Sequence, residues 1–193
     1  MFNRSIEKFW SWFDKKQTRV DTDIYNPEFL NEIDKTISGW GFGWEVGPGR
    51  SKPYSLTVSP NGDPTLIDGV NAVTSIAPAF ENWEVFSFKQ AKSNWDTLIF
   101  ERNTSINSRD WTYRLLMFPD EEIELEVKAD NLQSYSDETK ALIVDLVITN
   151  LLGESRKMNF LYDIVVVEAF ATSTGVTNIE HLPDHLAAKK KSS

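Results

Sequence analysis

The sequence predicts an α+β domain in which helices come first and a run of strands follows, with one further helix inserted among the strands. Apolar residues recur at three- and four-residue spacing within the first 40 positions, as they do in amphipathic helices. Farther along, short segments alternate apolar and polar residues, as strands with one buried face do. We therefore expect a single domain of residues 1–193, with two N-terminal helices and the inserted helix packed on a mainly antiparallel sheet.

The N-terminal region carries two amphipathic helix patterns. Residues 3–17 place aromatic and aliphatic side chains at helical spacing, with charged residues on the other side. In the second pattern, residues 27–38, Asn26 can cap the helix, Pro27 suits its first position and Gly39 can end it. The domain is thus expected to have three parts, an N-terminal helix, an α+β body and a flexible tail, in residues 1–20, 21–176 and 177–193.

The stretch from residue 39 to residue 90 holds the clearest strand, turn and helix signals. Residues 54–59 alternate apolar and polar side chains and predict a strand. The proline- and glycine-rich residues 60–64 predict a turn. Residues 66–77 then show helical spacing, and residues 83–88 return to an extended, apolar pattern.

After residue 90 the sequence predicts mainly strands. Residues 102–110 are expected to be a connection, and residues 141–152 are apolar at nearly every position. Their β-branched content favours a central strand covered on both faces, with a buried helix as the alternative. A short helix in residues 153–162 and a last strand in residues 164–167 complete the prediction. Three other segments have the composition of strands: Thr97–Glu101, Trp111–Phe118 and Ile123–Ala129.

The net charge of −9 is concentrated in one segment. Between Asp120 and Glu154 there are ten acidic residues and two lysines. Within residues 123–129, glutamates alternate with apolar side chains, so we expect one buried face and one acidic face. Such a charge repels nucleic acid and anionic membranes and favours a basic protein partner. The alternative is a solvated face that only keeps the protein soluble.

The composition excludes several kinds of chemistry. The chain has no cysteine, which excludes disulfides, thiolate zinc sites, iron–sulfur clusters and a cysteine nucleophile. No apolar segment has the length or flanks of a signal peptide or of a membrane span. We therefore expect a soluble, cytoplasmic protein, and the oligomeric state is left open.

The only two histidines are His181 and His185. A spacing of four would place both on one helical face, as a metal-binding pair requires. However, Pro183 lies between them, and an exposed tail is the interpretation we favour. We therefore expect no metal and no cofactor, and the lack of other histidines argues against Ser-His-Asp catalysis in the folded body.

Two groups of residues are candidates for binding. The acidic face of the predicted strand, together with exposed aromatic side chains, could be offered to a partner; its residues are Glu122, Glu124 and Glu126. The second group could form a small-ligand pocket or a carboxylate-dependent catalytic site near Glu45, Ser59 and Glu84, and Trp83 and Lys89 are further binding candidates in the same region of the chain. The tryptophans are expected mainly in the core, with a ligand-stacking groove as the alternative.

Five short motifs occur in an order that resembles a family of uncharacterised bacterial proteins. They are Trp44-Glu45-Val46-Gly47, Leu56-Thr57-Val58-Ser59 with Gly62, Ser75-Ile76-Ala77-Pro78, Trp83 to Phe88, and Leu152-Gly153-Glu154. Lys89-Gln90 departs from the pattern, because Arg-Pro often follows the aromatic residue there. The resemblance covers residues 28–168 and implies a bacterial α+β domain. It implies no established activity, although some such small acidic proteins are immunity proteins against toxins.

The sequence thus favours a protein-interaction module with an acidic face, which could be similar to an immunity protein. The alternative is a small-ligand binder or carboxylate-dependent enzyme that uses a pocket near Glu45, Ser59 and Glu84. Whether the protein catalyses a reaction is left open, with the absence of catalysis favoured.

Overall fold

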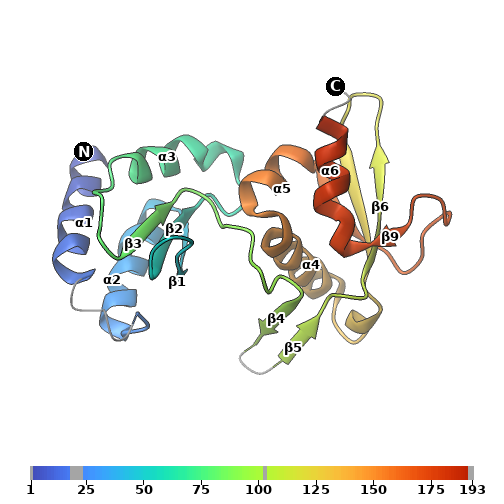
Figure 1. Cartoon of the computed structure of the whole chain (residues 1–193), viewed down its shortest axis with the longest axis horizontal. Coiled ribbons are helices and arrows are strands. Elements are labelled where there is room, and N and C mark those ends of the chain that lie inside the picture. The colour runs from blue at the N-terminus through green and yellow to red at the C-terminus, as the bar shows by residue number, and fades with distance from the viewer. Residues whose placement is uncertain (1, 18–23, 102–103, 191–193) are drawn as a thin grey trace. The chain divides into compact units, whose positions relative to one another are not determined.

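The computed structural model describes residues 2–17, 24–101 and 104–190 (Figure 1). These residues form six α-helices and three small, mostly antiparallel sheets, which confirms the α+β class. Their contacts group into two compact units, an N-terminal unit (residues 1–89) and a C-terminal unit (residues 90–193), and each has its own hydrophobic core. The expectation of a single domain stays a prediction.

The N-terminal unit packs three helices around a three-stranded sheet. The helices are α1 (Phe2–Gln17), α2 (Pro27–Ile37) and α3 (Ile67–Ser75). The sheet has the order β1 (Gly43–Pro48), β2 (Tyr54–Ser59) and β3 (Trp83–Phe86), with β1 antiparallel and β3 parallel to β2. The predicted helices and the strands over residues 54–59 and 83–88 are therefore confirmed. Most of their ends agree with the prediction to within two residues.

Local signals explain where the helices of this unit begin and how they are held. The side chain of Asn26 accepts hydrogen bonds from the backbone nitrogens of Glu28 and Phe29, so it caps α2 as predicted. Aromatic residues of α1 fill the core, and Trp10 Nε1 donates a 2.8 Å hydrogen bond to the carbonyl oxygen of Val73 in α3. This bond satisfies the indole of a fully buried side chain.

The C-terminal unit contains a two-stranded and a four-stranded sheet. Strands β4 (Thr97–Phe100) and β5 (Thr104–Asn107) form an antiparallel pair. The larger sheet has the order β8 (Asp163–Val166), β7 (Ile123–Lys128), β6 (Thr112–Met117) and β9 (Thr177–Asn178), in which only β8 is parallel to its neighbour. The helices of the unit are α4 (Asp137–Leu152), α5 (Glu154–Phe160) and α6 (Leu182–Lys190). The predicted strands over residues 97–101, 111–118, 123–129 and 164–167 and the short helix over residues 153–162 are confirmed.

The preferred prediction for residues 141–152 is wrong, because these residues belong to helix α4. Ser136 caps the helix by accepting a hydrogen bond from the backbone nitrogen of Thr139, and two acids follow in the first turn. The buried residues recur at helical spacing: Ile143, Val144, Val147, Ile148 and Leu151. An apolar residue on the exposed face, Leu142, obscured this periodicity in the sequence.

Two further expectations are wrong. Residues 104–107, expected within a connection, form β5, whose Ile106 is buried opposite Leu98 of β4. Residues 177–190, expected in an exposed tail, begin with β9 and continue into α6, where Leu182 and Leu186 are fully buried. The tail therefore contributes to the core of the C-terminal unit; residues 191–193 lie outside the described residues.

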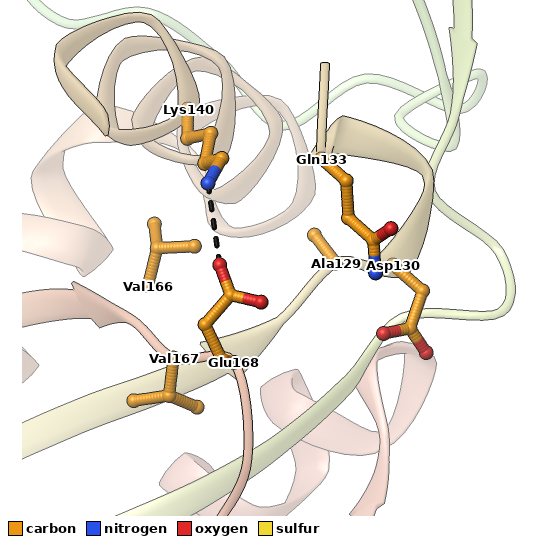
Figure 2. A pocket seen from close by; sticks show the side chains of 7 residues that line it. All are labelled: Ala129, Asp130, Gln133, Lys140, Val166, Val167 and Glu168. Atoms are coloured by element: carbon orange, nitrogen blue, oxygen red, sulfur yellow. Dashed lines mark hydrogen bonds and ion pairs between the residues drawn. The ribbon is translucent and has the colours of Figure 1, made fainter. Parts of the chain in front are cut away.

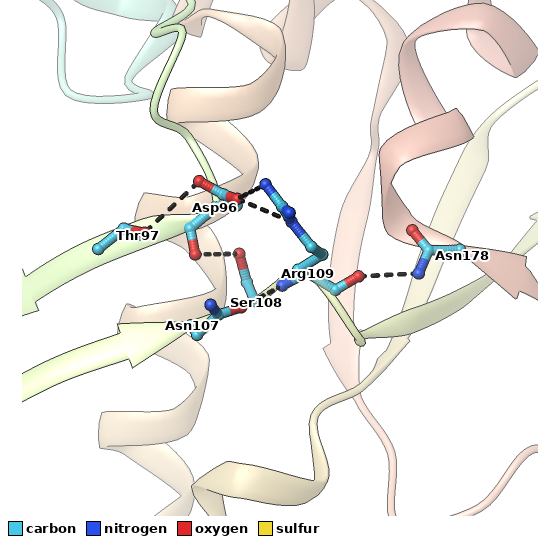
Figure 3. A network of polar contacts seen from close by, with 6 residues as sticks. All are labelled: Asp96, Thr97, Asn107, Ser108, Arg109 and Asn178. Atoms are coloured by element: carbon cyan, nitrogen blue, oxygen red, sulfur yellow. Dashed lines mark hydrogen bonds and ion pairs between the residues drawn. The ribbon is translucent and has the colours of Figure 1, made fainter.

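A network of polar contacts joins the β4–β5 pair to the large sheet (Figure 3). Arg109 donates two hydrogen bonds to the Asp96 carboxylate, at 2.7 and 3.1 Å. Buried Ser108 donates a hydrogen bond to the backbone carbonyl oxygen of Asp96. The side chain of Asn178 donates to the backbone carbonyl oxygen of Arg109. These bonds connect the start of β4, the end of β5 and strand β9.

Candidate functional site

Strand β7 has the two faces that the sequence predicts. Ile123, Leu125 and Val127 are buried, whereas Glu124 and Glu126 lie on the opposite face. The register with β6 places Leu116 beside Glu124 and Arg114 beside Glu126. The outer face of the sheet therefore carries apolar, basic and acidic side chains. Its net charge depends on which of the glutamates form ion pairs.

Glu126 is paired with Arg114 of the neighbouring strand. Arg114 contacts Glu126 Oε2 through Nε at 2.8 Å and through a terminal nitrogen at 2.6 Å. Both side chains are largely covered, with 12% and 14% of their surface exposed. The other terminal nitrogen of Arg114 donates to Thr172 in the β8–β9 connection. Glu126 thus holds Arg114 in place on the sheet, and its negative charge is balanced by the guanidinium group. Sequence reasoning did not predict this ion pair.

Five acidic residues gather at the end of the sheet where β6 turns into β7, and we call them the acidic end: Asp120, Glu121, Glu122, Glu124 and Asp163. Glu124 lies opposite Asp163 of β8. In the turn, Asp120 accepts a hydrogen bond from the backbone nitrogen of Glu122, and Glu121 has a φ of 68°. Glu122 and Glu124 thus belong to this set, whereas Glu126 is set apart from it by its arginine.

Three exposed apolar side chains accompany the acidic end. Met117, Phe118 and Tyr162 are 54%, 41% and 67% exposed. Met117 lies opposite Ile123 in the β6–β7 register, and the Tyr162 backbone nitrogen donates to the Ile123 carbonyl oxygen. Sequence reasoning did not single out these residues as a site. Tyr162 joins them only because β8 pairs beside β7, which no local pattern predicts.

The second predicted group lies on the sheet of the N-terminal unit. Glu45 pairs opposite Thr57, and Glu84 lies beside Ser55, so the register puts Glu45, Glu84 and Ser59 on one sheet face. Glu45 and Glu84 are separated by two strand spacings and two residues, roughly 12 Å.

Glu84 is engaged by the loop that follows β1. Its carboxylate accepts hydrogen bonds from the backbone nitrogens of Arg50 and Ser51, and from Ser51 Oγ at 2.5 Å. The hydrogen bond from the Ser51 hydroxyl, reinforced by those backbone donors, lowers the pKa of Glu84. Glu84 therefore acts as an acceptor that organises residues 49–54.

The other members of this group have local partners or are buried. Ser59 Oγ accepts a hydrogen bond from the backbone nitrogen of Asn61, and Lys89 Nζ donates to Asn61 Oδ1 at 2.7 Å. Trp83 packs among Phe13, Phe29 and Tyr54 with only 1% of its surface exposed. Trp83 is therefore a core residue, and its assignment as a binding residue is wrong.

A small cavity lies beside α4, near the ends of β7 and β8 (Figure 2). Its volume of about 10 Å³ can hold a single water molecule. Lys140 extends toward it and forms ion pairs with Asp137 at 3.1 Å and Glu168 at 3.3 Å. The hydrogen bonds that Lys140 donates to these two carboxylates raise its pKa, so its ammonium group joins α4 to Glu168, just after β8, as a stable cation.

Within the described residues, no three histidine, aspartate or glutamate side chains cluster as a metal site. None of the described helices combines the length and the apolar character that crossing a bilayer requires. Comparison with known proteins gave no match to a family model, a curated protein or a solved structure. The resemblance to uncharacterised bacterial proteins therefore stays a prediction.

Proposed function

We propose that this protein is a non-enzymatic interaction module of the bacterial cytoplasm that binds a basic surface of another protein through its acidic end. The observation that carries the proposal is the joint placement of five acidic and three exposed apolar side chains at one end of the large sheet. Exposed aromatic residues supply buried contact area in an interface, and charges around them guide the encounter.

The chemistry of the acidic end fits a basic partner. Of the two strand glutamates, Glu126 is balanced by Arg114, whereas Glu124 lies opposite a second acid, Asp163. Neighbouring like charges are unfavourable in the free protein, and a cationic partner relieves that repulsion. The partner is thus expected to present lysine or arginine side chains around an apolar patch.

A role as an immunity protein is one form of this proposal. It rests on the resemblance and on the acidic character of the chain, because a basic toxin would be a fitting partner. The alternative, a small-ligand site near Glu45, Ser59 and Glu84, has one supporting observation, since these residues share a sheet face.

A capture experiment with matched variants tests the proposal. The tagged protein and a variant with Glu122→Lys, Glu124→Lys and Asp163→Lys are compared as baits in lysate of the native host, with mass spectrometry as the readout. A control variant carries the same charge change on exposed acids of the N-terminal unit, Glu7→Lys, Glu28→Lys and Glu81→Lys. We expect a basic protein to bind the wild type and the control but not the first variant. Equal capture by all three baits would contradict the proposal.

A further inference from the structure

The two histidines lie together at the start of the last helix. His181 ends a short 3-10 helix (Ile179–His181), and His185 lies in the first turns of α6, which continues from it. Pro183, which lies between the two histidines, occupies the first turn of α6, where its missing N–H is not needed. The ring centroids of the two histidines are 6.2 Å apart, with 32° between the ring planes.

The ring of His185 is oriented by a buried tyrosine. His185 Nδ1 is 2.6 Å from the hydroxyl oxygen of Tyr113, which projects from β6 into the core. A hydroxyl can donate to or accept from an imidazole nitrogen. Because Nδ1 is engaged by the protein, Nε2 is the nitrogen that an external ligand can reach.

Charges of both signs lie near the histidine pair, since Arg156 donates a 2.6 Å hydrogen bond to the carbonyl oxygen of Pro183, between the two histidines. Glu180 Oε1 is 3.6 Å from His181 Nε2. The nearest lysine along the helix, Lys189, has its Nζ 3.0 Å from the sulfur of Met117. The ammonium group is thus directed to the β6–β7 hairpin, one helical turn beyond His185.

We propose that His181 and His185 form a two-histidine chelate for a divalent transition metal such as Zn²⁺, with the Nε2 atom of each ring as ligand. Imidazole nitrogen suits Zn²⁺, Cu²⁺ and Ni²⁺ and is a poor ligand for Mg²⁺ or Ca²⁺. Water molecules complete the coordination shell, and Glu180 adds negative charge beside it.

The geometry needs a small adjustment. Zinc–nitrogen bonds of about 2 Å at a tetrahedral angle place two imidazole centroids roughly 5 Å apart, about 1 Å closer than in the structure. The side chain of His181 is 52% exposed and can rotate to close this gap. His185 then keeps its proton on Nδ1 and donates it in a hydrogen bond to the Tyr113 hydroxyl, as metal-bound histidines do toward their supporting residues.

Calorimetric titration of the full chain with ZnCl₂ at pH 7.5 tests the proposal. We expect one Zn²⁺ per chain for the wild type and at least tenfold weaker binding for His181→Ala and for His185→Ala. Tyr113→Phe should retain one site with affinity reduced about tenfold, the usual effect of losing the group that orients a ligand. A Glu121→Gln, Glu122→Gln variant, changed at the acidic end, is the control and should bind like the wild type.

A second readout keeps the test independent of affinity. In ¹H–¹⁵N spectra of the imidazole rings, Zn²⁺ should shift the Nε2 resonances of both histidines and leave both Nδ1 atoms protonated. The proposal is overturned if the wild type binds Zn²⁺ no more tightly than His181→Ala, or if only one ring responds.

Discussion

The two units of this protein build their cores from different side chains. Among the described residues of the N-terminal unit, seven of the fourteen that are buried in the core are aromatic: Phe9, Trp10, Phe13, Phe29, Phe42, Phe80 and Trp83. In the part of the C-terminal unit that the structure describes, two of the seventeen buried core residues are aromatic, Trp111 and Tyr113, and aliphatic residues of α4 and β7 provide most of the rest. The first core is therefore filled largely by a few aromatic rings, whereas the second core is built from many smaller aliphatic side chains.

The difference extends to the surface. The C-terminal unit carries the acidic end, the Arg114–Glu126 pair and the two histidines, which are the features that our proposals use. In the N-terminal unit one of the two acids that sequence reasoning singled out, Glu84, is engaged in organising a loop. Under the proposed function, the first unit is mainly structural and recognition is located in the second.

The largest expected effect is on the aromatic core. Trp83→Ala removes the ring that contacts Phe13, Phe29 and Tyr54, and should lower the free energy of unfolding by about 3–5 kcal/mol. Urea denaturation followed by far-UV circular dichroism measures this. Trp83→Phe is the matched variant, because it keeps a ring and removes an indole N–H that has no hydrogen-bond partner in the structure. An alanine variant as stable as the phenylalanine variant would show that the ring is not essential.

A smaller effect is expected from one backbone position in the C-terminal unit. Gly153, between α4 and α5, has φ 78° and ψ 149°, a conformation that essentially only glycine adopts. Gly153→Ala should therefore cost about 1–3 kcal/mol in the same denaturation experiment. Gly47→Ala is the control, because a Cβ there has no atom within 4 Å, and its stability should be nearly unchanged. Equal stabilities of the two variants would refute the backbone argument.

The smallest effect concerns the pH dependence of the N-terminal unit. The folded pKa of Glu84 lies below its ordinary value of 4.5, because the carboxylate accepts hydrogen bonds from Ser51 and neighbouring backbone nitrogens. Its contribution to stability is thus fully present above pH 4.5 and is lost as the pH falls through the lowered folded value.

Glu84→Gln tests this dependence by comparison of urea midpoints at pH 7 and pH 3. We expect the variant to be less stable than the wild type at pH 7 and the difference to shrink at pH 3. Glu81→Gln, three residues earlier on the surface, serves as the control. A difference for Glu84→Gln that does not change with pH would argue against ionisation as its cause.

Local patterns in the sequence were sufficient for most elements of the fold. Alternation identified β2 and β7, and the Asn26-Pro27 pair identified the start of α2. Helix α4 was only the alternative prediction for residues 141–152, because apolar side chains extend beyond its buried face and remove the periodicity on which the prediction depends. The order of strands could not be predicted, since it depends on contacts between distant segments.

The candidate site was predicted only in part, for the same reason. The alternation of glutamates in β7 was visible, but the partner of Glu126 comes from β6 and the second acid beside Glu124 comes from β8. Likewise, the support of His185 by Tyr113 joins residues 72 positions apart. Local spacing in the sequence does not predict contacts between residues so far apart in the chain. The sequence therefore indicated the residue types, and the structure indicated how they are paired.

The salt dependence of association with the captured partner tests the central claim most directly. Stopped-flow rate constants are measured between 50 and 500 mM NaCl for the wild type and for the variant with lysines at positions 122, 124 and 163. We predict that the wild-type association rate falls steeply with added salt and that the variant is slow and nearly insensitive to salt. A wild-type rate independent of salt would contradict recognition through the acidic end.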